Sequence, residues 1–259
     1  MDLDISGKRA IVCGSSAGLG LGCATALAAE GVQLYMAARG EERLMAAANK
    51  LRGDTGVQIT PVVCDVTTEE GRNALLSACP DPDILVTNAA GPPAGNFREW
   101  DEEQWISALR ANMLTPIELI RSTVDGMTKR RFGRIVNITS GAVKAPISVL
   151  GLSNGARSGL TGFISGIARE VASYNVTINN LLPGFFETER LGHAFTAMGR
   201  AQASSAEAIR IAHQEAIPAR RFGTAQEFGQ VCAFLCSAQA GYLTAQNVLL
   251  DGGHYPGVF

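Results

Sequence analysis

Three glycines with the spacing Gly14-x-x-x-Gly18-x-Gly20 form the pattern in this chain best suited to binding a phosphate. They lie between a short apolar run, Arg9–Cys13, and an alanine-rich stretch, Leu21–Glu30, which we expect to be a strand and a helix. Small residues in such a turn let the backbone approach a pyrophosphate, to which the helix N-terminus offers free N–H groups. We therefore predict a dinucleotide site; the alternative is a tight turn without a ligand. The residues expected to line it are Gly14, Ser15, Ser16, Gly18, Leu19 and Gly20.

Polar residues also follow the second and third strand-like runs. Arg39 lies where the adenine ribose of a dinucleotide is expected, and Ala38 stands beside it in place of an acidic residue. A cation without a carboxylate suits a 2′-phosphate, which favours NADP over NAD; the alternative is an exposed loop arginine. Asp65, which precedes Val66, is expected either to accept from the adenine amino group or to cap the helix near Thr68.

The elements that must position these residues alternate between strand-like and helix-like stretches. The predicted strands are Arg9–Cys13, Val32–Ala38, Gln58–Cys64, Asp83–Thr87, Arg134–Ile138, Val176–Leu182 and Gln246–Leu250. The predicted helices are Leu21–Glu30, Glu41–Arg52, Thr68–Ser77, Glu102–Arg130 and Ser153–Ser173, and Phe185–Ala219 is an irregular-to-helical insertion. This alternation predicts an α/β fold over residues 1–259: one doubly wound domain with a parallel sheet and helices on both faces.

Composition excludes several classes of function. The chain has 22 Lys and Arg against 24 Asp and Glu, which gives no basis for a nucleic-acid or anionic-membrane partner. No apolar run approaches the ~20 residues of a membrane span, and Met1–Gly7 lacks the features of a signal peptide, so we expect a cytoplasmic protein. The six cysteines and three histidines show no zinc spacing, so we expect buried free thiols and no metal.

Several motifs in their order along the chain resemble the classical short-chain dehydrogenase/reductase family, and the resemblance spans nearly the whole sequence. They are the glycine turn, Asp65-Val66, Asn88-Ala89-Ala90-Gly91, Pro183-Gly184-Phe185-Phe186-Glu187-Thr188, Arg221-Phe222-Gly223, Glu227 and Asp251-Gly252-Gly253. The resemblance is nearest to β-ketoacyl-carrier-protein reductases. It implies a Rossmann-type sheet of seven parallel strands, a nicotinamide cofactor, a homodimer or homotetramer, and a substrate lid at residues 185–219. The resemblance also assigns six further residues to the cofactor site: Asn88, Ala89, Ala90, Pro183, Gly184 and Thr188. Of these, Thr188 is expected to bind the nicotinamide carboxamide.

The family's catalytic Asn, Ser, Tyr and Lys are matched only in part. Asn112 and Ser140 match the first two by register, since Asn112 lies 28 residues before Ser140. The tyrosine position, 13 residues after Ser140, holds Ser153, and the lysine position holds Arg157. No tyrosine stands between residues 36 and 173, so the family's usual acid/base is missing.

These substitutions change the proton chemistry that the resemblance implies. The family's tyrosine, whose reference pKa of ~10 is lowered by the lysine, gives a proton to a carbonyl as hydride moves. A serine hydroxyl is a much weaker acid, and arginine, with a pKa above ~12, cannot relay a proton as lysine can. Arg157 still has the charge to bind the nicotinamide ribose. The replacement acids considered are His193, Lys144 and Tyr255 of a neighbouring subunit.

Each catalytic candidate also has a structural interpretation. Asn112 is alternatively a residue that caps or kinks its helix, and Ser140 a turn residue. Ser153 is alternatively the N-cap of the helix that follows, and Arg157 the partner of a nearby carboxylate.

Two functions therefore remain open. The first is an NADP-dependent oxidoreductase acting on a carbonyl/alcohol pair, in which Ser140 and Asn112 orient substrate and water while Ser153 and Arg157 line the site. The second is a catalytically silent NADP-binding sensor or assembly protein. A third hypothesis is an enzyme that uses the scaffold for chemistry other than redox.

The cation at Arg39 predicts a preference for NADP. A guanidinium–phosphate contact contributes about 1.5–3 kcal/mol, so Arg39→Ala is expected to weaken NADP binding much more than NAD binding. Calorimetric titration with both cofactors measures the difference. Equal or tighter binding of NAD by the unmodified protein contradicts the prediction.

The predicted helices Glu102–Arg130 and Ser153–Ser173 resemble those that pair between subunits in the family. The second carries small residues that allow the close approach of a neighbour, namely Gly155, Ser158, Gly159, Gly162 and Gly166. We expect sedimentation at micromolar concentration to give a dimer or tetramer. A monomer under those conditions is the opposing result.

Overall fold

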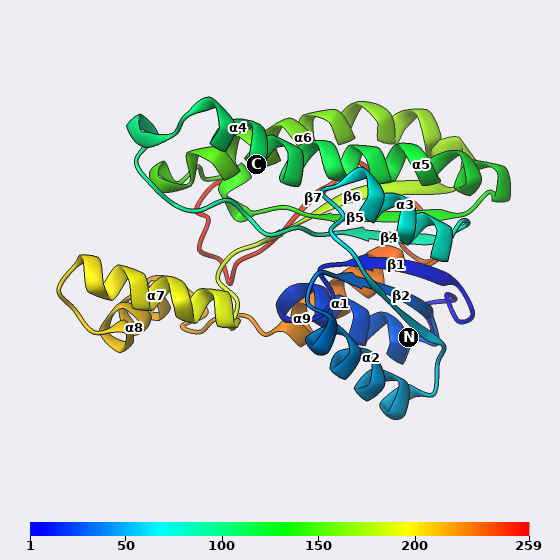
Figure 1. Cartoon of the computed structure of the whole chain (residues 1–259), viewed down its shortest axis with the longest axis horizontal. Helices are drawn as coiled ribbons and strands as arrows, with labels where there is room; N and C mark the ends of the chain where they lie inside the picture. Colours follow the sequence, from blue (N-terminus) through cyan, green and yellow to red (C-terminus); the bar gives the residue numbers. More distant parts are fainter. Residues whose placement is uncertain (259) are drawn as a thin grey trace.

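The computed structural model describes residues 1–258, and its strands form one parallel sheet in the order β3-β2-β1-β4-β5-β6-β7 (Figure 1). The strands are β1 (Arg9–Cys13), β2 (Gln33–Ala38), β3 (Ile59–Val63), β4 (Ile84–Thr87), β5 (Gly133–Ile138), β6 (Val176–Pro183) and β7 (Asn247–Leu250). The order reverses between β1 and β4, and ligands of such sheets bind beyond the carboxyl ends of the strands at that point. The predicted fold class, the single Rossmann-type domain and the seven parallel strands are confirmed.

Helices cover both faces of the sheet (Figure 1). They are α1 (Gly18–Ala29), α2 (Glu41–Thr55), α3 (Glu69–Ala78), α4 (Glu102–Leu109), α5 (Thr115–Arg130), α6 (Gly151–Val171), α7 (Glu189–Ala201), α8 (Ala206–Ala216) and α9 (Ala225–Cys236). Helices α1, α2 and α9 lie on one face, and α3, α5 and α6 lie on the other.

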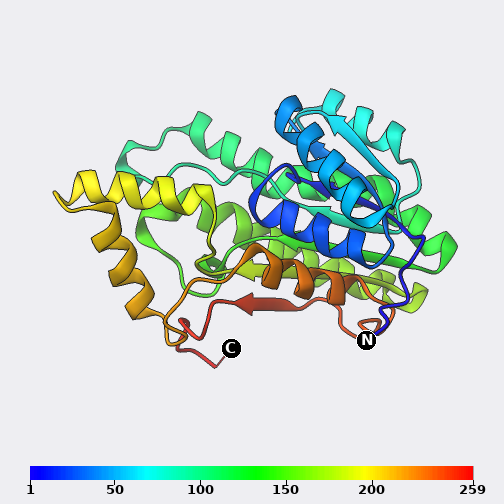
Figure 2. The same ribbon diagram turned by 90° about the horizontal axis from the view of Figure 1, so that it is seen from below.

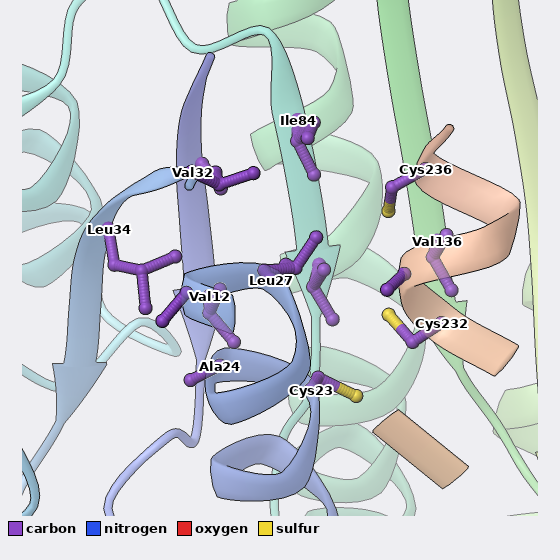
Figure 3. Close-up of a cluster of buried hydrophobic side chains, with 14 of the residues drawn as sticks. Val12, Cys23, Ala24, Leu27, Val32, Leu34, Ile84, Val136, Cys232 and Cys236 are labelled. Carbon is purple, nitrogen blue, oxygen red and sulfur yellow. The ribbon is translucent and has the colours of Figure 1, made fainter. Parts of the chain in front are cut away.

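The strands of this sheet are apolar on both sides because helices cover both of its faces. Successive residues of β1 point to opposite sides, so Val12 enters the core beneath α1 and α9 while Ile11 enters the core beneath α5 and α6. Figure 3 shows the first of these cores, where Leu27 of α1 lies beside Val12, and Cys232 of α9 lies beside Val136. All six cysteines are buried free thiols, as predicted.

Helices α1 and α9 pack closely because glycines meet at their contact. A Cβ added at Gly22 would lie 2.1 Å from the Ala225 carbonyl oxygen, and one added at Gly229 would lie 2.1 Å from the Gly22 carbonyl oxygen. Helix α9 was not among the predicted helices. Its signal is the capping box in which Thr224 accepts from the Glu227 N–H and Glu227 accepts from the Thr224 N–H, ahead of an apolar run.

The predicted continuous helix Glu102–Arg130 is wrong in one respect, because a π-helical turn, Arg110–Leu114, separates α4 from α5. Pro116 follows this turn and has no N–H to donate to the carbonyl of Asn112, four residues earlier. The Thr115 N–H donates instead to Arg110, five residues back. The chain widens there into a π turn, which contains Asn112.

A ladder of polar side chains, most of them buried, crosses four neighbouring strands of the sheet. Thr87 Oγ1 donates to Asn137 Oδ1 at 2.7 Å, Asn137 Nδ2 donates to Asn180 Oδ1 at 3.3 Å, and Asn180 Nδ2 donates to Asn247 Oδ1 at 2.9 Å. The backbone register pairs the same residues across β4, β5, β6 and β7. These bonds fix the register of four neighbouring strands.

The insertion at residues 185–219 contains α7 and α8, which lie at the end of the molecule towards which the β7 arrow points (Figure 2). It has a small core of its own, formed by Phe195, Ile209 and Ile217 with Phe222. No helix in residues 1–258 is long and apolar enough to span a membrane.

Replacement of Gly229 by alanine is expected to destabilise the fold, because the new methyl group must push α9 away from α1. Overpacking of this kind costs about 1–3 kcal/mol in the free energy of unfolding. The matched control is Gly53→Ala in α2, where a Cβ meets no atom within 4 Å and lower chain entropy should stabilise by about 0.4–1 kcal/mol. Denaturant titration at fixed protein concentration distinguishes the two; equal effects would count against this packing constraint.

Candidate functional site

The turn between β1 and α1 is closed by glycines that leave no room for side chains. Gly14 and Gly18 have φ of +60° and +57°, in the left-handed region that favours glycine. A Cβ at Gly20 would lie 2.2 Å from the Gly14 carbonyl oxygen, and one at Gly14 would lie 2.6 Å from Asn88 Nδ2. The side chain of Ala17, the N-cap of α1, makes no capping bond, so N–H groups of the first turn remain for an anion. This turn therefore fits the phosphates of a dinucleotide.

The residues predicted within the turn differ in what they offer to a ligand. Ser16 and Leu19 are half-buried at its surface. Ser15 is fully buried, and its N–H and hydroxyl both donate to the Ala37 carbonyl, at 3.2 and 3.5 Å. The hydrogen bonds of Ser15 thus join the turn to β2.

The end of β3 brings a carboxylate towards Arg39. Asp65 Oδ1 accepts from the N–H and the hydroxyl of Thr67, and Asp65 Oδ2 lies 3.9 Å from Arg39 Nη1. Burial acts to raise the pKa of Asp65, but the hydrogen bonds from Thr67 and the charge of Arg39 outweigh it and hold the pKa below its usual value. Thr68, not Asp65, caps α3, so the capping alternative for Asp65 is wrong. The Arg39 side chain is 72% exposed and accessible to a ligand.

The segment after β4 runs alongside the glycine turn. The side chain of Asn88 lies against Gly14 and Gly20, and the Ala90 carbonyl accepts from Asn112 Nδ2 at 3.4 Å. Ala89 lies between them and is half-buried. Across the sheet, the Gly184 N–H donates to the Leu250 carbonyl at 2.8 Å.

Arg157 is the most buried cation near the predicted catalytic residues. Its Nε donates to Ser153 Oγ at 3.2 Å and its Nη1 donates to the Ile138 carbonyl at 2.8 Å, at the end of β5. Burial, reinforced by repulsion from Arg190, lowers the pKa of Arg157 to about 10, so the group stays protonated at neutral pH. The capping alternative for Ser153 is wrong, since α6 begins at Gly151.

Ser140 and Asn112 each use part of their hydrogen-bonding capacity within the protein, and each has one further donor or acceptor that a ligand could use. Ser140 Oγ accepts from the Ala142 N–H at 3.1 Å, so its own hydrogen remains to be donated. Asn112 Nδ2 donates to the Ala90 and Ala108 carbonyls, while its buried Oδ1 has no partner among the described residues. An orphaned buried oxygen of this kind is suited to accept from water or substrate.

A cavity of about 440 Å³ opens beside Asn112. It is lined by Ala90, Gly91, Pro92, Pro93, Asp101, Glu103, Gln104, Ser107, Ala108, Ala111, Asn112 and Leu152. Of the predicted catalytic residues, Asn112 lines this cavity, whereas Ser140, Ser153 and Arg157 are not among its lining residues.

The insertion meets the glycine turn through Thr188, whose Cγ2 lies 3.6 Å from a Cβ built on Gly18. Thr188 also caps α7 by accepting from the Leu191 N–H. Two residues further on, the guanidinium of Arg190 lies against Gly91. Sequence reasoning missed Arg190; its only signal was a cation close behind Thr188.

The histidines are distributed differently from what the sequence suggested. His193 is exposed on α7 near Glu189, whereas His213 and His254 pack edge-on against Phe185, with ring centroids at 5.3 and 5.8 Å. Lys144 lies over the Tyr255 ring of its own chain, 5.9 Å from the centroid. Neither arrangement brings a histidine or a tyrosine against Ser153.

Thiols and metals contribute little to this site. Burial raises the pKa of Cys13, at the end of β1, to about 12, and burial with the charge of Asp65 raises that of Cys64. Both therefore stay protonated at neutral pH. Residues 1–258 contain no group of three or more His, Cys, Asp or Glu side chains arranged to hold a metal ion.

Comparison with known proteins gives consistent similarities. Residues 8–198 match the family described as short chain dehydrogenase. A 3-oxoacyl-(acyl-carrier-protein) reductase of Vibrio cholerae is 33% identical over 98% of this chain and 99% of its own. L-sorbose reductase from Gluconobacter frateurii, solved with NADPH and L-sorbose, superposes with a TM-score of 0.94 at 30% identity, covering 100% of both chains. An actinorhodin polyketide ketoreductase with NADPH gives a TM-score of 0.89 at 28% identity over 96% of this chain and 97% of its own.

Proposed function

The chain belongs to the short-chain dehydrogenase family, and on that premise we propose that it is an NADP-dependent reductase of a carbonyl group with a non-standard catalytic site. The glycine turn and Arg39 support the cofactor, as do the solved relatives that contain NADPH. One observation carries the proposal for the chemistry: Arg157 Nε donates to Ser153 Oγ, so a cation polarises a hydroxyl where the family has its proton donor.

Ser153 and Ser140 hold the substrate oxygen in this mechanism. Because Ser153 Oγ accepts from Arg157 and Ser140 Oγ accepts from the Ala142 N–H, each hydroxyl directs its own hydrogen to the carbonyl oxygen. The nicotinamide cofactor, when bound, supplies the hydride. Negative charge that develops on the substrate oxygen is stabilised by the Arg157 cation. Water that donates to Asn112 Oδ1 passes on a proton taken up from bulk solvent, which completes the alcohol and leaves no hydroxide in the site.

The remaining parts of the proposal concern the insertion and the assembly. Residues 185–219, which contain α7 and α8, form a lid over the substrate, and Thr188 caps the first of these helices. Two aromatic residues of this segment, Phe186 and Phe195, are buried and pack against their surroundings. The chain acts as a homodimer or homotetramer.

A catalytically silent NADP-binding sensor is the second candidate function. The observation that favours it is that the Arg157 guanidinium already hydrogen-bonds to the protein itself. Its Nη1 donates to the Ile138 carbonyl and its Nε donates to Ser153 Oγ. The position at which the family has its proton-donating tyrosine is occupied by Ser153.

The double substitution Ser153→Tyr with Arg157→Lys tests the reductase proposal. It restores a phenol and the ammonium that tunes it, so turnover of generic ketones with NADPH should rise, by at most the ~10²–10⁴ expected of a general acid. The single substitutions should give less, because the two groups act as a unit. Ser153 is buried, so crowding by the larger ring reduces the gain.

Steady-state kinetics on a panel of ketones, with NADPH binding measured in each variant, supplies the comparison. No turnover in either protein with NADPH still bound favours the sensor. Fast turnover by the unmodified protein that is lost in His193→Ala identifies a substitute acid instead.

A further inference from the structure

One ion pair ties the insertion at residues 185–219 to the body of the protein. Arg43 Nη2, on α2, donates to both carboxylate oxygens of Glu189, on α7, at 2.7 Å. The two residues are 146 positions apart in the chain. Among the ion pairs of residues 1–258, this one alone joins the insertion to another part of the chain. The pair therefore breaks if the insertion moves away from α2.

The start of α7 contacts two walls of the cofactor site at adjacent residues. Thr188 lies against the glycine turn, where its Cγ2 is 3.6 Å from a Cβ built on Gly18. The next residue, Glu189, binds Arg43, which follows the exposed Arg39 by four positions. In Figure 1 the N-terminal end of α7 is the end that lies towards α1 and α2. The start of α7 thus connects the turn that fits the phosphates with the element that follows the cation suited to a 2′-phosphate.

The rest of the insertion packs mainly on itself. Phe195, the large buried side chain of α7, belongs to the insertion's own small core. Backbone hydrogen bonds join the insertion to its surroundings at its two ends. At the first end the Gly223 N–H donates to the Phe185 carbonyl, and at the second the Ala219 N–H donates to the Gly252 carbonyl. A unit that has its own core and is attached at its ends can move as one body.

We propose that the Arg43–Glu189 ion pair is a latch, which holds the insertion closed over the bound dinucleotide and limits the rate at which NADPH is released. The inference rests on the proposed lid. The two side chains are 58% and 66% exposed. Exposed ion pairs shift an equilibrium only about twofold to fivefold. A latch of this strength slows release of the cofactor without preventing it.

Glu189→Gln gives the sharpest test, because direct electrostatics and the latch predict opposite results. The substitution removes a negative charge beside the site for the cofactor phosphates, so electrostatics alone would slow the release of NADPH. Loss of the latch should instead speed release about twofold to fivefold. Stopped-flow displacement of NADPH, followed by its fluorescence, measures the rate.

A second readout needs no cofactor. Arg43→Gln should raise hydrogen exchange of the backbone amides in residues 188–200 about twofold to fivefold, although the substitution lies on α2. A local effect on α7 cannot produce this result. The double variant Arg43→Gln with Glu189→Gln should release NADPH no faster than the faster single variant, because both substitutions remove one interaction.

The matched control is Lys50→Gln. Lys50 forms an exposed ion pair with Asp54 at 2.8 Å, but the pair lies within α2. Lys50→Gln should leave both NADPH release and exchange in residues 188–200 unchanged. Unchanged or slower release in Glu189→Gln overturns the proposal, and so does an equal increase in Lys50→Gln.

Hydrogen exchange in the unmodified protein separates the latch from the lid on which it rests. If NADPH does not lower exchange in residues 188–200, the lid is wrong and the latch proposal falls with it. If NADPH lowers exchange there but neither Arg43→Gln nor Glu189→Gln speeds release, the lid stands and the latch is wrong. None of these measurements uses turnover, so their outcome does not depend on whether the chain reduces a carbonyl.

Discussion

The side-chain ladder from Thr87 through Asn137 and Asn180 to Asn247 is the interaction on which the site depends most. Each of its hydrogen bonds contributes only about 0.5–1.5 kcal/mol to the free energy of unfolding. Leaving one of the buried polar groups unpaired would cost more than the bond contributes. A slip of any one strand by one residue would break the ladder, because every side chain of that strand would then point to the opposite face of the sheet. The ladder thereby holds the residues that follow β4, β5 and β6 at one edge of the sheet, and the dinucleotide turn faces them from β1.

The sequence could predict those parts of the fold that depend on local pattern. Apolar runs predicted all of the strands to within a few residues, since a strand covered on both faces is mostly apolar. The π turn at Arg110–Leu114 was missed because its cause, the absent N–H of Pro116, is a single atom in an otherwise periodic helix. Arg190 was missed because its contact with Gly91 spans 99 residues and depends on how α7 packs.

The same distinction separates what could and could not be predicted at α6. The sequence shows that position 153 is not a tyrosine and position 157 is not a lysine. It does not show which groups the Arg157 side chain contacts. A guanidinium with burial this deep needs acceptors within reach, and α6 provides Ser153 one turn earlier while β5 provides the Ile138 carbonyl. Ser153 therefore serves inside the helix as the hydrogen-bond partner of Arg157 and not as the N-cap. The N-cap of α6 is Leu150, three residues earlier.

The exchange of lysine for arginine also changes what this position can recognise. An ammonium is a compact charge that can surrender a proton, whereas the guanidinium of Arg157 keeps its charge at a pKa of about 10 and has donors pointing in several directions. Two of its nitrogens are already fixed on Ser153 and Ile138, which orients the group without help from a ligand. A cation oriented in this way is better suited to stabilising nearby negative charge than to relaying a proton. Arginine at this position therefore keeps the positive charge of a lysine but not the capacity of a lysine to relay a proton.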